Sequence, residues 1–221
     1  MKIPPWSFSS IDSFETCPEK YNAAKVAKTF PDKANEYSIW GNRVHSAIEQ
    51  RLRNKKPLPE GMEQWEPLME IFDNPGGKLL VEQRYALNRQ FGPCEWGDAW
   101  TRGILDVGII RKKNAKIYDW KTGKRKLTWQ LKLTAAVTMH AMPYIESVDV
   151  GFVWLQGGDI DEERFTRDDL PAIWEEILPK VVRWEKAYQT NKWEKRPSGL
   201  CKGWCSNLKC PFNQPRKEND E

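Results

Sequence analysis

The chain has 221 residues, and its 35 Lys and Arg against 31 Asp and Glu give a formal net charge of +4 at pH 7. Hydrophobic residues make up 39% and aromatic residues 12%, which excludes a disordered chain, and no apolar run is long enough for a membrane span. The first residues lack the apolar core of a signal peptide, so we expect a cytoplasmic protein. The mild charge implies that any contact with nucleic acid is local.

The first third of the chain predicts helices. Residues 7–29 predict a helical segment that starts with a capping-box-like pattern at Ser9 and breaks or restarts at Pro18. Apolar residues at four-residue steps predict a helix over 39–54, and 62–73 predict a weaker one.

The middle of the chain predicts strands. Residues 78–88 form the first of them, and 102–110 and 115–121 form two more that are joined at 111–114. A helix is expected over 127–142.

The last third predicts a buried strand over 148–156, a short polar strand that ends at Phe165, and a long helix that starts at Thr166. This order indicates an α/β or α+β fold with a mixed sheet between helices. We expect one domain over 1–212, followed by a polar, flexible tail over 213–221.

The two central strands carry an acidic cluster. If their hairpin turns about residues 112–113, Asp106 lies opposite Asp119, and Lys121 points to the same face as Asp119. Two opposed carboxylates repel each other, and a divalent cation such as Mg²⁺ or Mn²⁺ would offset the repulsion. That arrangement suits metal-assisted phosphodiester hydrolysis. A surface hairpin with an exposed ion pair is the alternative, and the spacing alone does not decide between them.

The five cysteines are unevenly spaced. The odd count argues against a disulfide framework. Three of the five fall within ten residues near the C-terminus, which favours a metal site over reduced cysteines in a loop. They are Cys17, Cys94, Cys201, Cys205 and Cys210.

The acidic hairpin resembles the signature of the PD-(D/E)XK nuclease superfamily, in the form found in RecB-type exonuclease domains. Asp106 and the run from Asp119 to Lys121 carry this resemblance. Four further motifs of the family are present, and all of them occur in the family's order along the chain. They are the opening segment 7–21, a glycine four residues before His45, a Gln-Leu pair at Gln130, and the terminal cysteines. The resemblance covers roughly residues 7 to 212.

This resemblance implies a restriction-endonuclease-like fold, in which a mixed central β-sheet is flanked by helices. It implies metal ligands at His45, Asp106 and Asp119, a catalytic lysine at Lys121, and a supporting contact from Gln130. Glu82 is a further candidate acid near the metal, although a solvent-facing strand glutamate is the alternative reading. The family's tyrosine four residues after Gln130 is Thr134 here, which puts one supporting contact in doubt.

For the cysteines, the resemblance implies a 4Fe–4S cluster that ties the C-terminal subregion 197–212 to the N-terminal helix. The gaps between the last three cysteines are three and four residues, whereas the family usually has two and five. Zinc stays open as the alternative metal. Cys94 has no partner in this scheme. The implied ligands are Cys17, Cys201, Cys205 and Cys210.

The resemblance implies a metal-dependent exonuclease that acts on linear DNA with ends. The chain has no phosphate-loop motif and therefore no helicase. Its size resembles phage-encoded recombination exonucleases and CRISPR-associated adaptation nucleases, which suggests recombination or replication proteins as partners. The alternatives are a catalytically inactive DNA-binding module of the same fold and a zinc-stabilised interaction protein. Strand polarity and oligomeric state are not predicted.

Overall fold

The computed structural model describes residues 2–30, 35–126 and 128–214. It has two compact units. We call residues 35–175 the sheet unit, and the residues before 35 together with those from 176 onward the terminal unit. The single domain expected over 1–212 stays a prediction, and most of the expected tail, from residue 215, lies outside the described residues.

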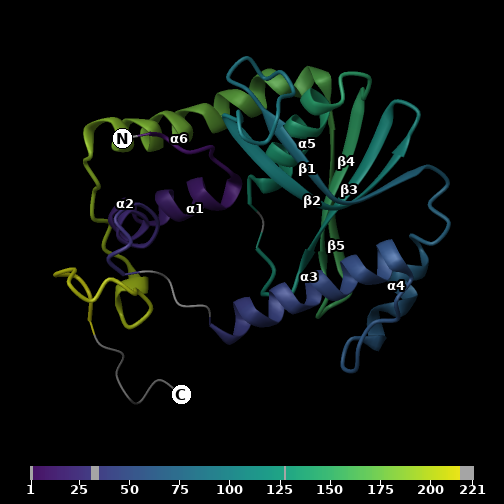
Figure 1. The fold of residues 1–221 in the computed structure, drawn as a ribbon, viewed down its shortest axis with the longest axis horizontal. Helices are drawn as coiled ribbons and strands as arrows, with labels where there is room; N and C mark the ends of the chain where they lie inside the picture. Colours follow the sequence, from purple (N-terminus) through teal and green to yellow (C-terminus); the bar gives the residue numbers. More distant parts are fainter. Residues whose placement is uncertain (1, 31–34, 127, 215–221) are drawn as a thin grey trace. The chain divides into compact units, whose positions relative to one another are not determined.

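The sheet unit contains five strands in the order β1-β2-β3-β4-β5 (Figure 1). Neighbouring strands are antiparallel except β3 and β4, which are parallel and are connected through helix α5 (Gln130–Ala141). A parallel pair needs such a crossover. The sheet is therefore mixed, as predicted. The strands are β1 (Lys78–Leu87), β2 (Thr101–Arg111), β3 (Asn114–Lys121), β4 (Ser147–Trp154) and β5 (Asp159–Thr166).

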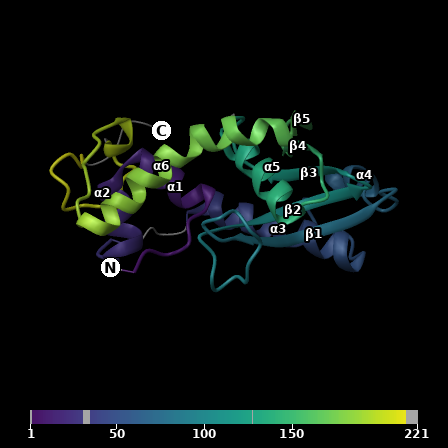
Figure 2. The same ribbon diagram turned by 90° about the horizontal axis from the view of Figure 1, so that it is seen from above.

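Helices cover both faces of this sheet (Figure 2). Helix α5 packs on one face, where Ile117 and Val150 are fully buried beneath it. Helices α3 (Glu36–Asn54) and α4 (Glu66–Glu70) belong to the core of the other face, with Val107 and Trp120. The site described below lies where both cores meet the middle strands. None of the described helices is long and apolar enough to cross a bilayer.

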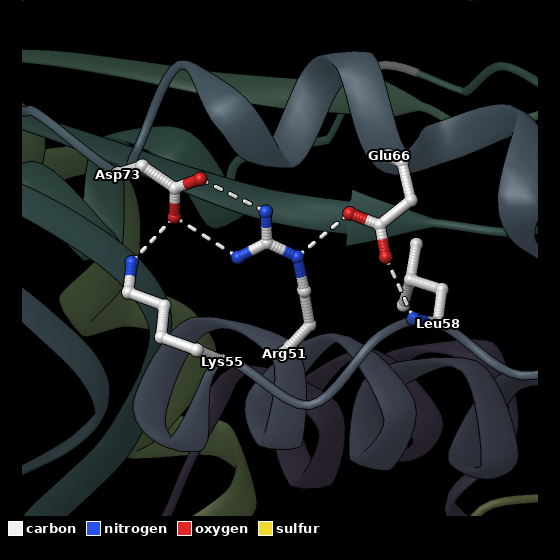
Figure 3. A network of polar contacts seen from close by, with 5 residues as sticks. All are labelled: Arg51, Lys55, Leu58, Glu66 and Asp73. Atoms are coloured by element: carbon white, nitrogen blue, oxygen red, sulfur yellow. Dashed lines mark hydrogen bonds and ion pairs between the residues drawn. The ribbon is translucent and has the colours of Figure 1, made fainter.

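A polar network fixes α3 within the sheet unit (Figure 3). The Arg51 guanidinium donates to both oxygens of Asp73 at 2.9 Å, and its Nε donates to Glu66 Oε2 at 2.7 Å. Lys55 also pairs with Asp73, and the second oxygen of Glu66 accepts from Leu58 N at 2.7 Å. Because only 10% of the Arg51 side chain is exposed, its charge depends on these carboxylates.

The terminal unit joins the two ends of the chain. Tyr21 and Tyr188 are buried, and their hydroxyls lie 3.1 Å apart although the residues are far apart in sequence. Arg196 donates to Glu15 O at 2.7 Å and ties the C-terminal segment to α1. The elements of the terminal unit are α1 (Phe8–Thr16), α2 (Pro18–Tyr21), the short π-helix Asn22–Val26, most of α6 (Leu170–Thr190) and the 3₁₀ turn Gly199–Cys201.

Most predicted elements are confirmed within a few residues, with two corrections. The expected cap at Ser9 is wrong: Ser7 caps α1, because its Oγ accepts from Ser10 N while Ser10 Oγ accepts from Ser7 N at 2.9 Å. The expected helix over 62–73 is divided into a 3₁₀ turn and α4, with Pro67 in the first turn of α4, where a missing N–H costs nothing. Leu127, in the expected helix over 127–142, lies outside the described residues.

Candidate active site

The β2–β3 hairpin brings the acidic residues together. Its register runs from Arg111–Asn114 to Val107–Tyr118, which confirms the predicted turn at 112–113. The next residues along the two strands are Asp106 and Asp119. The Asp106 carboxylate accepts a 2.8 Å hydrogen bond from the backbone N of Trp120, so its position is fixed by the neighbouring strand.

Asp119, Lys121 and Gln130 form a closed set of polar contacts. Lys121 Nζ lies 2.5 Å from Asp119 Oδ2 and donates to Gln130 Oε1 at 3.0 Å. The Gln130 amide nitrogen donates to Asp119 Oδ1 at 2.7 Å. As predicted, the side chains of Asp119 and Lys121 share a face, because they lie two residues apart on one strand. Gln130 reaches them from the first residue of α5.

Helix α3 contributes His45 to the same region. His45 Nδ1 lies 3.3 Å from Asp106 Oδ2, and Nε2 lies 3.0 Å from the carbonyl oxygen of Trp120. A Cβ on Gly41, one turn earlier, would lie only 3.3 Å from Thr122 Oγ1. A side chain at this position would therefore crowd the chain just after β3.

Glu82 of β1 completes the acidic cluster. Ligand atoms of His45, Glu82 and Asp106 all lie within 4.8 Å of one another, and among the described residues they are the one such group of metal-ligating side chains. Glu82 has a positive φ of 47°, which is uncommon for a residue other than glycine. This conformation interrupts the regular pairing between Val81–Val107 and Gln83–Leu105. Backbone strain of this kind concentrates at functional sites.

Burial and mutual repulsion disfavour the ionised form of two carboxylates in this site, Asp119 and Glu82. Burial, with the nearby charge of Asp106, raises the pKa of Asp119 from 3.8 to about 6, although Lys121 and His45 oppose the shift. Burial and the charges of Asp106 and Glu49 raise the pKa of Glu82 from 4.5 to about 7. Burial lowers the pKa of His45, but its contacts with Asp106 and the charge of Asp119 outweigh this and raise it. A bound cation would relieve all of this repulsion.

Sequence reasoning missed two partners of this site. Phe152 places its ring 4.8 Å from Lys121 Nζ, in cation–π distance. Phe152 pairs with Asp119 in the parallel β3–β4 ladder, so a register prediction for β4 would have found it. The backbone of Trp120 bonds both Asp106 and His45, and no side-chain motif signals such contacts.

The four cysteines that were predicted as metal ligands lie in the terminal unit. All four line one pocket of about 420 Å³, part of which is open to solvent: Cys17, Cys201, Cys205 and Cys210. Two of their sulfurs accept weak hydrogen bonds at 3.5 Å, Cys17 from Lys20 N and Cys201 from Ser198 N. In the described parts of the chain, no three cysteine sulfurs lie within 4.8 Å of one another. Cys94 belongs to the sheet unit.

The mixed sheet, its flanking helices and the acidic hairpin with its lysine define a restriction-endonuclease-like domain. A model of the PD-(D/E)XK nuclease superfamily matches residues 5–214, nearly the whole chain. The chain therefore belongs to the PD-(D/E)XK nuclease superfamily.

Solved structures share this fold at low sequence identity. The protein SSO0001 matches with a TM-score of 0.50 and 14% identity, over 96% of this chain and 89% of its own. A "putative exonuclease" from Eubacterium rectale matches with a TM-score of 0.50 and 14% identity, over 89% of this chain and 91% of its own. At these identities the likeness concerns the fold. No curated protein matches the chain in sequence.

Proposed function

We propose that the protein is a metal-dependent DNA exonuclease of the RecB-like type. The observation that carries this proposal is the arrangement of Asp119, Lys121 and Gln130 beside Asp106 and His45. A half-buried lysine held between a carboxylate and an amide, next to further acids, suits phosphoryl chemistry. The chain belongs to the PD-(D/E)XK superfamily, and the motif resemblance implies the same residues.

The donor set fits Mg²⁺ or Mn²⁺. Oxygen ligands of such ions lie about 2.1 Å from the metal, so opposite ligands are about 4.2 Å apart. The ligand atoms of His45, Glu82 and Asp106 meet this requirement, since they lie within 4.8 Å of one another. We propose His45, Asp106 and Glu82 as ligands on this geometry. Asp119, which the family resemblance implies as a ligand, lies outside this group of three, and we propose it as a further ligand. When bound, the ion polarises the phosphate and lowers the pKa of a water molecule.

The side chains have separate tasks in this proposal. The Lys121 ammonium stabilises the negative charge that develops on the phosphate, and it orients the attacking water. Asp119 and Gln130 hold Lys121 in place through contacts of 2.5 and 3.0 Å. Asp106 keeps the His45 ring oriented, and the Trp120 backbone holds both. The half-buried setting strengthens each of these interactions relative to water.

We further propose that the four clustered cysteines bind a 4Fe–4S cluster. A tetrahedral zinc site with Zn–S bonds of about 2.3 Å places its sulfurs about 3.8 Å apart. Here no three described cysteine sulfurs come within 4.8 Å of one another, and the proposal rests on the pocket that all four cysteines line. The backbone N–H groups of Lys20 and Ser198, which donate to the sulfurs of Cys17 and Cys201, suit cysteine thiolates that ligate iron. The cluster would join the N-terminal helices to the C-terminal segment.

The test compares linear and covalently closed circular DNA, each with Mg²⁺, with Mn²⁺ and with a chelator. The matched variant is Asp106→Asn, which keeps the shape of a side chain that is 10% exposed. We expect the wild type to degrade linear DNA, to spare the circle and to stop when the metal is chelated, while the variant is inactive. Nicking of the circle would instead show an endonuclease.

Two other outcomes would overturn the proposal. Binding of DNA without cleavage under every metal condition would favour an inactive binding module. Zinc in the purified protein, with neither iron nor nuclease activity, would favour a zinc-stabilised interaction protein. Recombination or replication proteins as partners, and a phage or CRISPR setting, follow from the family resemblance alone.

A further inference from the structure

Two arginines and a tryptophan form a fixed cluster at one end of β1 and β2. The loop between these strands folds back onto them: Cys94 N donates to Ala86 O at 3.1 Å, and Trp100 N donates to Leu87 O at 2.9 Å. Trp96 in this loop lies next to both strands. Its ring centroid is 4.8 Å from the Arg102 guanidinium carbon and 5.3 Å from that of Arg84.

Within the described chain, neither arginine of this cluster has a carboxylate partner. The loop carries Glu95 and Asp98, but neither forms an ion pair with Arg84 or Arg102. Two guanidinium groups that share one ring repel each other. The attraction between the ring and each cation is worth only about 0.5–1 kcal/mol and offsets part of this repulsion. The cluster therefore keeps two ordered positive charges without an internal counter-charge. This is the electrostatic condition for binding an anion.

The cluster lies on the strands that carry the acidic site. Arg84 is two residues after Glu82 on β1, and Arg102 is four residues before Asp106 on β2. At about 3.3 Å per residue, these separations are roughly 7 and 13 Å along the strands. Ile104, which pairs with Arg84 and lies between Arg102 and Asp106, is 45% exposed. Charged and apolar side chains thus alternate along the surface that leads to the acids.

We propose that Arg84 and Arg102, held in place by Trp96, bind a backbone phosphate of the polynucleotide strand near the linkage that is cut. The planar fork of arginine matches phosphate, and the cluster lies within a few nucleotides of the acidic site. The exposed Ile104 suits contact with the sugars and bases that alternate with phosphates. The inference rests on the proposed nuclease function, and Trp96 acts as a positioning residue.

The test measures binding without catalysis. Protein carrying Lys121→Ala is titrated, in chelator, against a labelled single-stranded oligonucleotide of about 15 residues at several salt concentrations. Each phosphate contact adds about 0.7 to the slope of log affinity against log salt. The variant R84Q/R102Q, which loses the contact with this one phosphate, should lower that slope by about 0.7 and weaken binding roughly tenfold or more. Lys112→Gln, an exposed cation at the other end of β2, should change neither quantity.

A second arm identifies the ligand as a phosphate. Oligonucleotides in which one linkage at a time is an uncharged methylphosphonate are bound to both proteins. One position should weaken binding to the parent and have no further effect in R84Q/R102Q, as a double-mutant cycle requires. Trp96→Phe should retain the slope, whereas Trp96→Ala should weaken binding although no charge is lost. If R84Q/R102Q does not fold, the methylphosphonate scan on the parent and on Trp96→Ala decides.

The inference is overturned if R84Q/R102Q keeps the parental slope, or if no methylphosphonate position couples to the arginines. It can also fail separately from the proposed function. If the wild type cuts DNA but R84Q/R102Q has the parental salt dependence of binding, only the phosphate site is refuted. If the wild type never cuts DNA but R84Q/R102Q has a lower salt dependence of binding, only the nuclease proposal is refuted.

Discussion

Asp119→Asn should stabilise the metal-free protein, and the gain should grow as the pH rises. The pKa of Asp119 is raised from 3.8 to about 6 by burial and by the charge of Asp106. The folded state therefore binds this proton more tightly than the unfolded state does. Its contribution to stability is fully present below about pH 3.8 and is lost as the pH rises to about 6. A shift of about two units corresponds to about 3 kcal/mol.

The difference in the free energy of unfolding between Asp119→Asn and wild type should increase by about 1.4 kcal/mol from about pH 5 to about pH 7.5. Taking this difference cancels the titrating groups that do not interact with Asp119, such as Glu82, whereas the loss of the Asp119 charge also lowers the pKa of His45. The absolute gain should be smaller than 3 kcal/mol, because asparagine loses the ion pair with Lys121.

Urea denaturation in chelator at several pH values measures this difference. Adding Mn²⁺ near pH 7.5 should raise the unfolding free energy of the wild type and have less effect on the variant. A difference in unfolding free energy that does not change with pH would contradict the raised pKa of Asp119. It would mean that the Asp119 carboxylate is neither desolvated nor repelled in the folded protein.

Arg51→Met should lower the free energy of unfolding by about 2–3 kcal/mol, because it leaves two carboxylates without their buried partner. Arg53→Met removes a more exposed ion pair and should lower it by less than about 1 kcal/mol, so equal losses in urea denaturation would contradict this prediction. Gln130→Ala should lower kcat by roughly 10- to 100-fold with little change in DNA binding, since Lys121 loses one of its two supports, and a steady-state assay that shows only a higher KM would count against it. Cys205→Ser should lower the iron content and visible absorbance and reduce the melting temperature, whereas Cys94→Ser should leave all three unchanged.

The sequence predicted the parts of the fold that depend on local patterns. The apolar steps at Val44 and Ile48 predicted α3, and both residues are fully buried. Alternation and the basic turn predicted the β2–β3 hairpin with its correct register, so that Asp119 and Lys121 could be assigned to one face. These features were accessible because strand and helix periodicity act over a few residues.

Features that depend on tertiary contacts were not predictable from these patterns. The left-handed backbone of Glu82 has no sequence signal, since only the packed site maintains it. The Phe152 ring beside Lys121 depends on the parallel pairing of β3 with β4, which α5 brings about. The start of α1 at Ser7 also depended on which serine hydroxyls could bond reciprocally, and sequence spacing favoured Ser9 incorrectly.

The catalytic role of the β2–β3 hairpin can be measured as the cleavage rate of end-labelled linear DNA by the wild type and Lys121→Ala, with Lys112→Ala as the matched control. We expect Lys121→Ala to be slower by about 10²- to 10³-fold or more while it binds DNA as well as the wild type, and the Lys112→Ala control to be unaffected. Equal cleavage by all three proteins would contradict the assignment of the β2–β3 hairpin as the catalytic site.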